Sequence, residues 1–299
     1  MSRHMGNQSA LSVEAHVDLH ALVADYPSEL LSVREVTQLK SSHSLRATYR
    51  LEFIDKGIVK GRVLDEPAQA RRLVALAPYL DKSVFPQLIA VRGHALLEEW
   101  REGLPLTAPG ADQTWAFFAG KVLGALHASE LNPEILEDPE RTLAPQMERL
   151  GRALENIVLA GGLRHAQASV LRHSACSQAP GTLKAGLVHL DFCAENMIQH
   201  EGRLYVIDNE LLDIGILDAD LGRTWYRWPS LQHHEFLRGY QQFRDATGFL
   251  QRQMFWAVYT LSLAADYRLT AELPSVAVLN ELRKLATKAQ ETSDSTASR

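Results

Sequence analysis

The chain has 299 residues, 46% of them hydrophobic and 22% charged, which is enough for a sizeable core in one large domain or two modest ones. Its 31 basic and 36 acidic residues give a formal net charge of -5, which argues against nucleic acid or an anionic membrane as the main partner. The two cysteines, Cys176 and Cys193, match neither a disulfide framework nor a paired-cysteine zinc site, and the longest apolar run, Met254–Ala265, is too short for a bilayer. We therefore expect a cytoplasmic protein with no signal peptide.

The first hundred residues have the pattern of an antiparallel sheet that carries one helix. Residues 1–12 are polar and aperiodic, so we expect them to be disordered. A helix is predicted from Pro67 to about Leu80, because proline is favoured in the first turn and leucines recur along one side. Four strands are predicted, the first two forming a hairpin around Gly57: Ala47–Phe53, Ile58–Val63, Val84–Val91 and His94–Trp100.

After residue 100 the pattern becomes mainly helical. Helices are predicted at Thr114–Ser129, Pro145–Ala160 and Leu163–His173, and again from about Ser230 onward. Gly186–Ile207 interrupts them with two short apolar strands around polar residues, and the polar tail 290–299 is expected to be disordered.

These elements predict an α+β fold of two lobes. Residues 1–100 form a small N-terminal antiparallel-sheet lobe, and residues 101–299 form a larger, mainly helical C-terminal lobe. We expect a ligand to bind between the two lobes.

The densest group of chemically active side chains lies between Leu187 and Glu210. Four residues separate Asp191 from Asn196, and a strand-like run ends at Asp208, twelve residues after Asn196. Phosphoryl transfer needs an aligned nucleophile that can lose its proton and a metal ion that neutralises phosphate charge. The Asp191 carboxylate can serve the nucleophile, and the oxygens of Asn196 and Asp208, at the two ends of a hairpin, suit one Mg²⁺. The alternative is an ordinary loop of caps and turn residues.

Four segments of the chain resemble the kinase-like small-molecule phosphotransferases, such as aminoglycoside phosphotransferases and choline kinases. They are a catalytic-loop pattern at His189–Asn196, a metal-binding pattern at Ile207–Glu210, a following Asp-Leu run at Gly215–Leu221, and a Leu-Gly-x-Leu-His helix at Leu123–His127. The resemblance covers roughly residues 35–270. It implies a bilobal protein-kinase-like fold, ATP and Mg²⁺ as cofactors, and transfer of the γ-phosphate to a hydroxyl of a small-molecule acceptor.

The resemblance also implies a nucleotide-binding set in the N-terminal lobe. Lys60 stands at the position of the lysine that contacts the nucleotide phosphates, with a solvated strand lysine as the alternative. Glu66 either pairs with Lys60 or acts as a favourable charge at the helix N-terminus. Ser42 takes the place of the glycine-rich phosphate loop, and Glu98 and Trp100 lie in the segment that resembles the hinge meeting adenine.

Supporting roles are implied for four more residues. His189 is expected to be a hydrogen-bonding scaffold of the catalytic loop rather than a base, and Asp220 to accept hydrogen bonds from that loop; the alternative for Asp220 is a helix-start carboxylate. Glu210 and Trp225 are candidates for the acceptor site. Trp225 can stack on a sugar or a cation, and core packing is its alternative.

Three residues depart from the family pattern inside this core. Glu195 stands where a glycine often precedes the asparagine, and Asn209 replaces the usual aromatic residue. Cys193 lies inside the catalytic loop, where it is either oxidisable or an inert buried thiol. These departures leave the acceptor and the level of activity open.

The charges of the C-terminal part bear on the acceptor. From Tyr205 to Arg299 there are twelve acidic and ten basic residues, and five of the acids precede Leu221, where they are partly committed to metal and loop. The remainder is close to neutral and does not favour a highly cationic acceptor. A sugar, an amino alcohol and another hydroxylated metabolite are equally open.

Two other functions stay as alternatives to a small-molecule kinase. A protein kinase is disfavoured because the Asp-Phe-Gly and Ala-Pro-Glu signatures of an activation segment are missing. A non-catalytic or regulatory nucleotide-binding protein is favoured by the missing glycine loop but disfavoured by the retained Asp191, Asn196 and Asp208. The choice between ATP and GTP and the oligomeric state are open.

Overall fold

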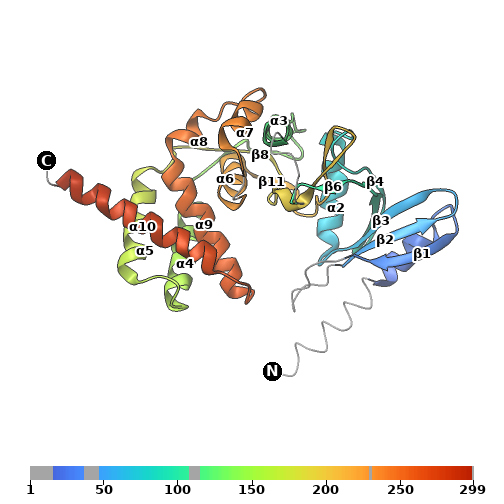
Figure 1. The fold of residues 1–299 in the computed structure, drawn as a ribbon, viewed down its shortest axis with the longest axis horizontal. Coiled ribbons are helices and arrows are strands. Elements are labelled where there is room, and N and C mark those ends of the chain that lie inside the picture. The colour runs from blue at the N-terminus through green and yellow to red at the C-terminus, as the bar shows by residue number, and fades with distance from the viewer. Residues whose placement is uncertain (1–15, 37–46, 108–114, 229–230, 298–299) are drawn as a thin grey trace, which may run out of the picture. The chain divides into compact units, whose positions relative to one another are not determined.

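A computed structural model describes residues 16–36, 47–107, 115–228 and 231–297 of the chain (Figure 1). The chain divides into two compact units: Met1–Asp112 with Ala194–Asp213, and Gln113–Cys193 with Ile214–Arg299. The division differs from the expected boundary at residue 100. The segment 194–213 belongs with the N-terminal unit because its hairpin pairs with a short strand at Leu104–Pro105.

The first unit contains the predicted antiparallel sheet, with one strand more than expected. The strand order is β1-β2-β3-β5-β4, with the bounds Leu30–Glu35 (β1), Ala47–Phe53 (β2), Gly57–Val63 (β3), Leu88–Arg92 (β4) and Ala95–Glu99 (β5). The hairpin of β2 and β3 is confirmed, and Gly57 takes a φ of +68° in its turn. Strand β4 begins at Leu88 instead of Val84, because the amides of Val84 and Phe85 bond to the carbonyl of Asp81 in a turn.

The two faces of β3 differ in character, as the alternation of side chains along a strand requires. Val59, Gly61 and Val63 lie toward a buried cluster that also contains Leu51 and Leu97. A Cβ at Gly61 would lie 2.8 Å from the end of the Leu51 side chain, which would have to shift to make room for it. Lys60 and Arg62 therefore project from the opposite face of the strand.

Helix α2 and a second small sheet complete the first unit. Helix α2 spans Pro67–Leu76 and continues as a 3-10 turn at Ala77–Tyr79, because Pro78 lacks the N–H that an α-helix needs. The small sheet has the order β10-β9-β6, with the bounds Arg203–Val206 (β10), Met197–His200 (β9) and Leu104–Pro105 (β6). Glu201 and Gly202, both with positive φ, form the two-residue turn between β9 and β10.

The second unit is mainly helical. Its helices are Trp115–His127 (α3), Ala144–Leu159 (α4), His165–Ser177 (α5), Leu217–Arg227 (α6), His233–Tyr240 (α7), Thr247–Gln251 (α8), Gln253–Thr270 (α9) and Val276–Ala297 (α10). A three-stranded sheet has the order β11-β8-β7, with the bounds Asp213–Ile216 (β11), Leu183–Val188 (β8) and Glu140–Arg141 (β7). No helix in the described ranges is long and apolar enough to cross a membrane.

Helix packing in the second unit depends on small residues and on one central helix. A Cβ at Gly124 of α3 would lie 2.5 Å from the carbonyl oxygen of Tyr240, so glycine lets α3 and α7 approach closely. Helix α9 is buried along much of its length, with Phe255 and Trp256 fully enclosed, and it packs against α4, α5, α6 and α10.

The expected disordered tail from Gln290 is wrong, because α10 continues to Ala297. Figure 1 shows this helix running alongside α5 and α9. Leu279, Leu282, Ala286 and Ala289 of α10 are buried, and that contact supports a helix that extends further than the polar sequence suggests. The predicted disorder of residues 1–12 lies outside the described residues.

Candidate active site

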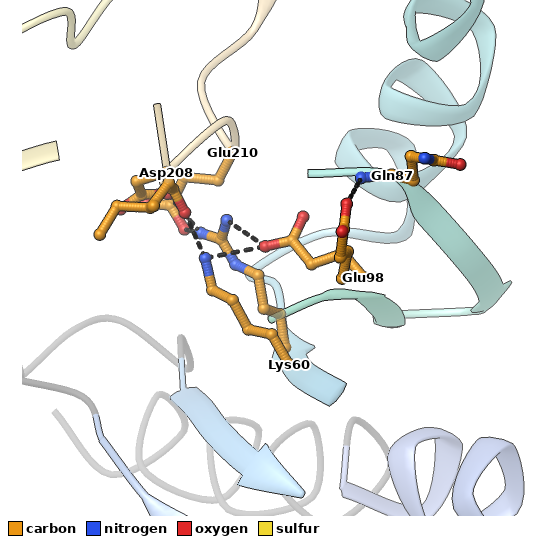
Figure 2. Close-up of polar contacts among 8 residues, drawn as sticks. Lys60, Gln87, Glu98, Asp208 and Glu210 are labelled. Carbon is orange, nitrogen blue, oxygen red and sulfur yellow. Dashed lines mark hydrogen bonds and ion pairs between the residues drawn. The ribbon is translucent and has the colours of Figure 1, made fainter. Parts of the chain in front are cut away.

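The first unit places Lys60 opposite Glu98 on neighbouring strands. The two residues are partners in the register of β3 and β5, and Nζ of Lys60 lies 2.8 Å from Oε1 of Glu98 (Figure 2). Lys60 also donates a hydrogen bond to the carbonyl oxygen of Ile207. Both side chains are largely buried, which leaves the ammonium with a fixed position and direction.

Helix α2 does not supply the carboxylate partner of Lys60. Glu66 is exposed at the N-cap of α2, where its amide donates a hydrogen bond to the Gln69 side chain. Arg72, on the same helix, pairs with Asp213 at 2.6 Å. Of the two expectations for Glu66, a charge at the helix N-terminus fits its position. Glu98 is the partner of Lys60.

Arg62 joins three carboxylates at one point of the first unit. Its Nη2 lies 2.7 Å from Oδ1 of Asp208 and also contacts Glu210, and its Nη1 lies 3.5 Å from Glu98. Burial alone lowers the pKa of this guanidinium, but the carboxylates of Asp208, Glu98 and Glu210 outweigh it and raise the pKa. Arg62 is therefore fully charged, and its side chain is only 3% exposed.

Asn196 and Asp208 lie at the two ends of the β9–β10 hairpin, as the sequence predicts. Asn196 ends a 3-10 turn at Ala194–Asn196 just before β9, and its carbonyl oxygen accepts a hydrogen bond from the amide of Ile207, next to Asp208. Within the described ranges no cluster of three or more His, Cys, Asp or Glu side chains could hold a metal ion. The oxygen donors present fit a hard cation that keeps several of its waters, as Mg²⁺ does.

The second unit holds the loop that follows β8, and a buried carboxylate fixes its backbone. Asp220, in the first turn of α6, accepts hydrogen bonds from the amides of His189 and Leu190 at 2.9 and 2.8 Å. Leu190 has a φ of +63°, which costs a non-glycine residue about 1–2 kcal/mol. The amide of Asp191 donates to Nδ1 of His189 at 3.3 Å, so His189 contacts the loop backbone from inside the unit.

His127 ties the Asp220 carboxylate to helix α7. Nε2 of His127 lies 3.0 Å from Oδ2 of Asp220, and its Nδ1 lies 2.8 Å from the hydroxyl of Tyr240. Burial would raise the pKa of Asp220, but the hydrogen bond and charge of His127 and the bond from the His189 amide lower it. Burial raises the pKa of Tyr240, so its hydroxyl stays protonated. The chain of bonds keeps Asp220 ionised under the loop.

The Asp191 carboxylate faces an arginine. Oδ1 of Asp191 lies 3.1 Å from Nη1 of Arg227, at the end of α6, and both side chains are about 30% exposed. Arg223 lies one helical turn before Arg227. The carboxylate predicted to serve the nucleophile is thus accessible and lies beside a guanidinium.

The chain matches the sequence model of one protein family over most of its length. The model of the phosphotransferase enzyme family matches residues 36–255, which is 220 of the 299 residues. The chain belongs to this family. Its reaction class is ATP-dependent phosphoryl transfer to a hydroxyl group of a small molecule. A comparison with curated proteins gives no match.

Solved structures share the fold of this phosphotransferase at low sequence identity. Macrolide 2'-phosphotransferase MphH from Brachybacterium faecium is 19% identical, with a TM-score of 0.60 and coverage of 91% of this chain and 97% of that one. Choline kinase from Cryptosporidium parvum is 12% identical, with a TM-score of 0.58 and coverage of 94% and 97%. Spectinomycin phosphotransferase, in complex with ADP and spectinomycin, is 13% identical, with a TM-score of 0.61 and coverage of 91% and 97%.

The remaining predicted site residues of the phosphotransferase have varied surroundings. Ser42 lies outside the described residues. Trp100 follows β5, with the guanidinium of Arg50 5.9 Å from its ring centroid. Trp225 stacks on His233 at 3.9 Å between ring centroids, so one face of its indole is already covered. Glu210 is engaged by Arg62. The nucleotide and acceptor roles of these residues stay predictions.

Several polar residues of the phosphotransferase were not foreseen as site residues. Arg62 lies two positions after Lys60, and side chains alternate along a strand, so the sequence alone could have placed Arg62 on the same face as Lys60. Arg223 and Arg227 lie three and seven residues after Asp220, and this spacing could have placed all three on one face of α6. His127 was noted only as part of a helix pattern. Its contact with Asp220 spans 93 positions, and no local pattern reveals it.

Proposed function

We propose that Asp191 aligns the acceptor hydroxyl and accepts its proton, and that Asn196 and Asp208 hold Mg²⁺. The observation that carries the proposal is the fixed loop: two amide bonds to the ionised Asp220 hold Leu190 in a strained conformation next to Asp191. Strain of this kind persists only where surrounding structure enforces it, and it is typical of active sites. A pre-positioned, partly exposed carboxylate is what proton transfer from a hydroxyl needs.

Lys60, held by Glu98, is the residue we assign to the nucleotide phosphates. An ammonium on a buried strand acts as a point charge for phosphate oxygens, and the Glu98 contact fixes its direction. Bound Mg²⁺ would neutralise the charge that the phosphates carry during transfer. Arg62 keeps Asp208 and Glu210 from repelling each other before the metal binds. ADP is bound in the solved spectinomycin phosphotransferase, which supports ATP as the donor.

The acceptor is a hydroxylated small molecule, and the relatives named above act on chemically different ones. We therefore assign only the hydroxyl group from the family. We also propose a cytoplasmic location, where ATP is available. Within the described residues, Cys176 and Cys193 are free thiols, which fits a reducing compartment.

Substituting Asp191 tests the catalytic assignment. Asp191→Ala should lower turnover about 100- to 10,000-fold, the range for general acid–base catalysis, because alignment and proton acceptance are lost. Its affinity for a fluorescent ATP analogue should stay within about twofold. The matched control is Asp266→Ala, since Asp266 contacts Asn156 on the surface of the same unit. The measurement is ADP release with MgATP across a panel of hydroxylated acceptors.

Two results would overturn this assignment. Full turnover by a folded Asp191→Ala variant with a true acceptor would remove Asp191 from the chemistry. Binding of MgATP by the wild-type protein without phosphoryl transfer to any acceptor of a broad panel would favour a non-catalytic nucleotide-binding protein.

A further inference from the structure

Helix α6 presents a line of charged side chains that starts under the catalytic loop. Asp220, Arg223 and Arg227 are spaced three and four residues apart, which places them on one face of the helix. Asp220 is buried and bonded to the loop, and Arg227 reaches the Asp191 carboxylate. The helix face that fixes the loop therefore continues as two arginines beside it.

Arg223 lies near two other arginines, Arg227 and Arg149. Burial is the largest effect that lowers the pKa of the Arg223 guanidinium, and the positive charges of Arg227 and Arg149 lower it further. The negative charges of Asp220 and Asp191 act in the opposite direction. Arg223 makes no hydrogen bond or ion pair within the described part of the chain. A half-buried guanidinium without a fixed partner has five N–H donors to offer a ligand.

A third arginine, from α4, joins the same group. The positive charges of Arg149 and Arg223 both act on the hydroxyl of Tyr259 on α9 and lower its pKa. Burial raises the pKa of Tyr259, so the hydroxyl remains protonated. Helices α4 and α6 both pack on α9, and the charges of Arg149 and Arg223 act on one another.

Among the described residues that act on Arg223 most strongly, the arginines outnumber the carboxylate that a ligand can reach. Arg227 and Arg149 add positive charge to that of Arg223, and Asp191 and Asp220 are the opposing carboxylates. Asp220 is enclosed by His127 and two backbone amides and is not available to a ligand. Concentrated positive charge attracts anions, and the planar guanidinium forks match carboxylate and phosphate oxygens.

We propose that the phosphate acceptor carries an anionic group, a carboxylate or a phosphate, and that Arg223, with Arg149 and Arg227, binds this group beside Asp191. The acceptor class is thus a hydroxy acid or a phosphorylated polyol rather than a polycation. Arg227 links the two functions, because it contacts Asp191 and lies one helical turn from Arg223. This inference rests on the proposed catalytic position of Asp191.

An acceptor screen sorted by charge tests the inference. The probes are matched compounds that differ in the anionic group: glycerate and glycerol, gluconate and glucose, and glucose 6-phosphate and glucose, with choline and kanamycin as cations. The full-length protein is assayed for MgATP-dependent ADP release and, separately, for an increase in Tm at matched ionic strength. We expect turnover and Tm increases to concentrate in the anionic members. Stronger turnover or binding of neutral or cationic members overturns the inference, and so does a lack of binding by every anionic member.

Arginine variants separate the acceptor from the nucleotide as the anion that is bound. Arg223→Gln should raise KM for the anionic acceptor about 10- to 100-fold, the effect of losing a charge-assisted hydrogen bond, and leave KM for ATP unchanged. Arg223→Lys should recover part of the loss. Arg152→Gln is the control, because Arg152 is exposed on α4 and pairs with Glu148. A rise in KM for ATP alone assigns the arginines to the nucleotide and overturns the inference.

The two proposals fail in distinguishable ways. Turnover of a neutral or cationic acceptor that depends on Asp191 keeps the proposed function and removes the anionic acceptor. Arg223-dependent binding of anionic compounds, with no phosphoryl transfer to any acceptor, keeps the anion site and removes the proposed function.

Discussion

The two units of this phosphotransferase contain groups of charged side chains with opposite excess charge. In the first unit, Lys60 and Arg62 meet the three carboxylates of Glu98, Asp208 and Glu210, so the cations are fully paired and one negative charge is in excess. In the second unit, Arg227 pairs with Asp191, and Arg223 and Arg149 add two further positive charges to this group.

The sign of the excess charge indicates which kind of ligand each group of side chains can bind. A group with a negative excess and oxygen donors can accept a divalent cation together with the nucleotide phosphates. A group with a positive excess can accept an anion that brings its own charge. We therefore propose that the unit with the negative excess binds the nucleotide with its cation and that the unit with the positive excess binds the acceptor.

The largest effect should come from removing the cation that three carboxylates of the first unit share, Arg62. Arg62→Gln leaves three carboxylates without their shared cation and should lower the free energy of unfolding by about 3–5 kcal/mol, the range for a broken buried ion pair. MgCl₂ should raise the Tm of this variant more than that of the wild type. Thermal unfolding measures both effects, with Arg92→Gln as the exposed control. A variant as stable as the wild type, without a larger response to Mg²⁺, would contradict this role of Arg62.

A smaller effect is expected in the second unit at Asp220. Asp220→Asn removes a charged acceptor of two amide bonds and should lower the free energy of unfolding by about 3 kcal/mol. The folded pKa of Asp220 is lowered from 3.8, so its stabilisation is present above that value and is lost as pH falls through the folded pKa.

Unfolding measured against pH checks this sign. The difference in stability between the wild type and Asp220→Asn should be constant from pH 7 to pH 5 and should narrow as the pH falls below about 4. A difference that widens on acidification would show that Asp220 is not stabilised in its charged form.

The smallest effect compares two glutamates of the first unit. Glu98→Gln should raise KM for ATP about tenfold, since Lys60 loses the charge that fixes it. Glu66→Gln should leave KM for ATP unchanged, because Glu66 is exposed at the N-cap of α2. Steady-state kinetics with varied ATP measures both. The reverse order of effects would restore Glu66 as the partner of Lys60.

Local sequence patterns were sufficient for part of the fold. The β2–β3 hairpin follows from branched residues around Gly57, and the start of α2 follows from Pro67. Strand β1 was missed, although its pairing with β2 is regular. The extent of α10 was also missed, because its stability comes from helices that are distant in sequence.

In the candidate site, too, the sequence predicted the local features but not the tertiary contacts. The spacing of Asp191, Asn196 and Asp208 could be read directly, because a loop and a hairpin are local structures. Glu98 as the partner of Lys60 depends on the register of two strands, and Arg227 beside Asp191 depends on the packing of α6. Tertiary contacts therefore determine which of these charges are paired, and the acidic and basic counts alone do not reveal that pairing.

A crossed kinetic measurement tests the contrast between the two units most directly. KM for ATP and KM for the anionic acceptor are both determined for the wild type, Glu98→Gln and Arg223→Gln. The account predicts that Glu98→Gln raises only KM for ATP and that Arg223→Gln raises only KM for the acceptor, each about tenfold or more. A rise in KM for ATP in Arg223→Gln, with KM for the acceptor unchanged, would contradict it.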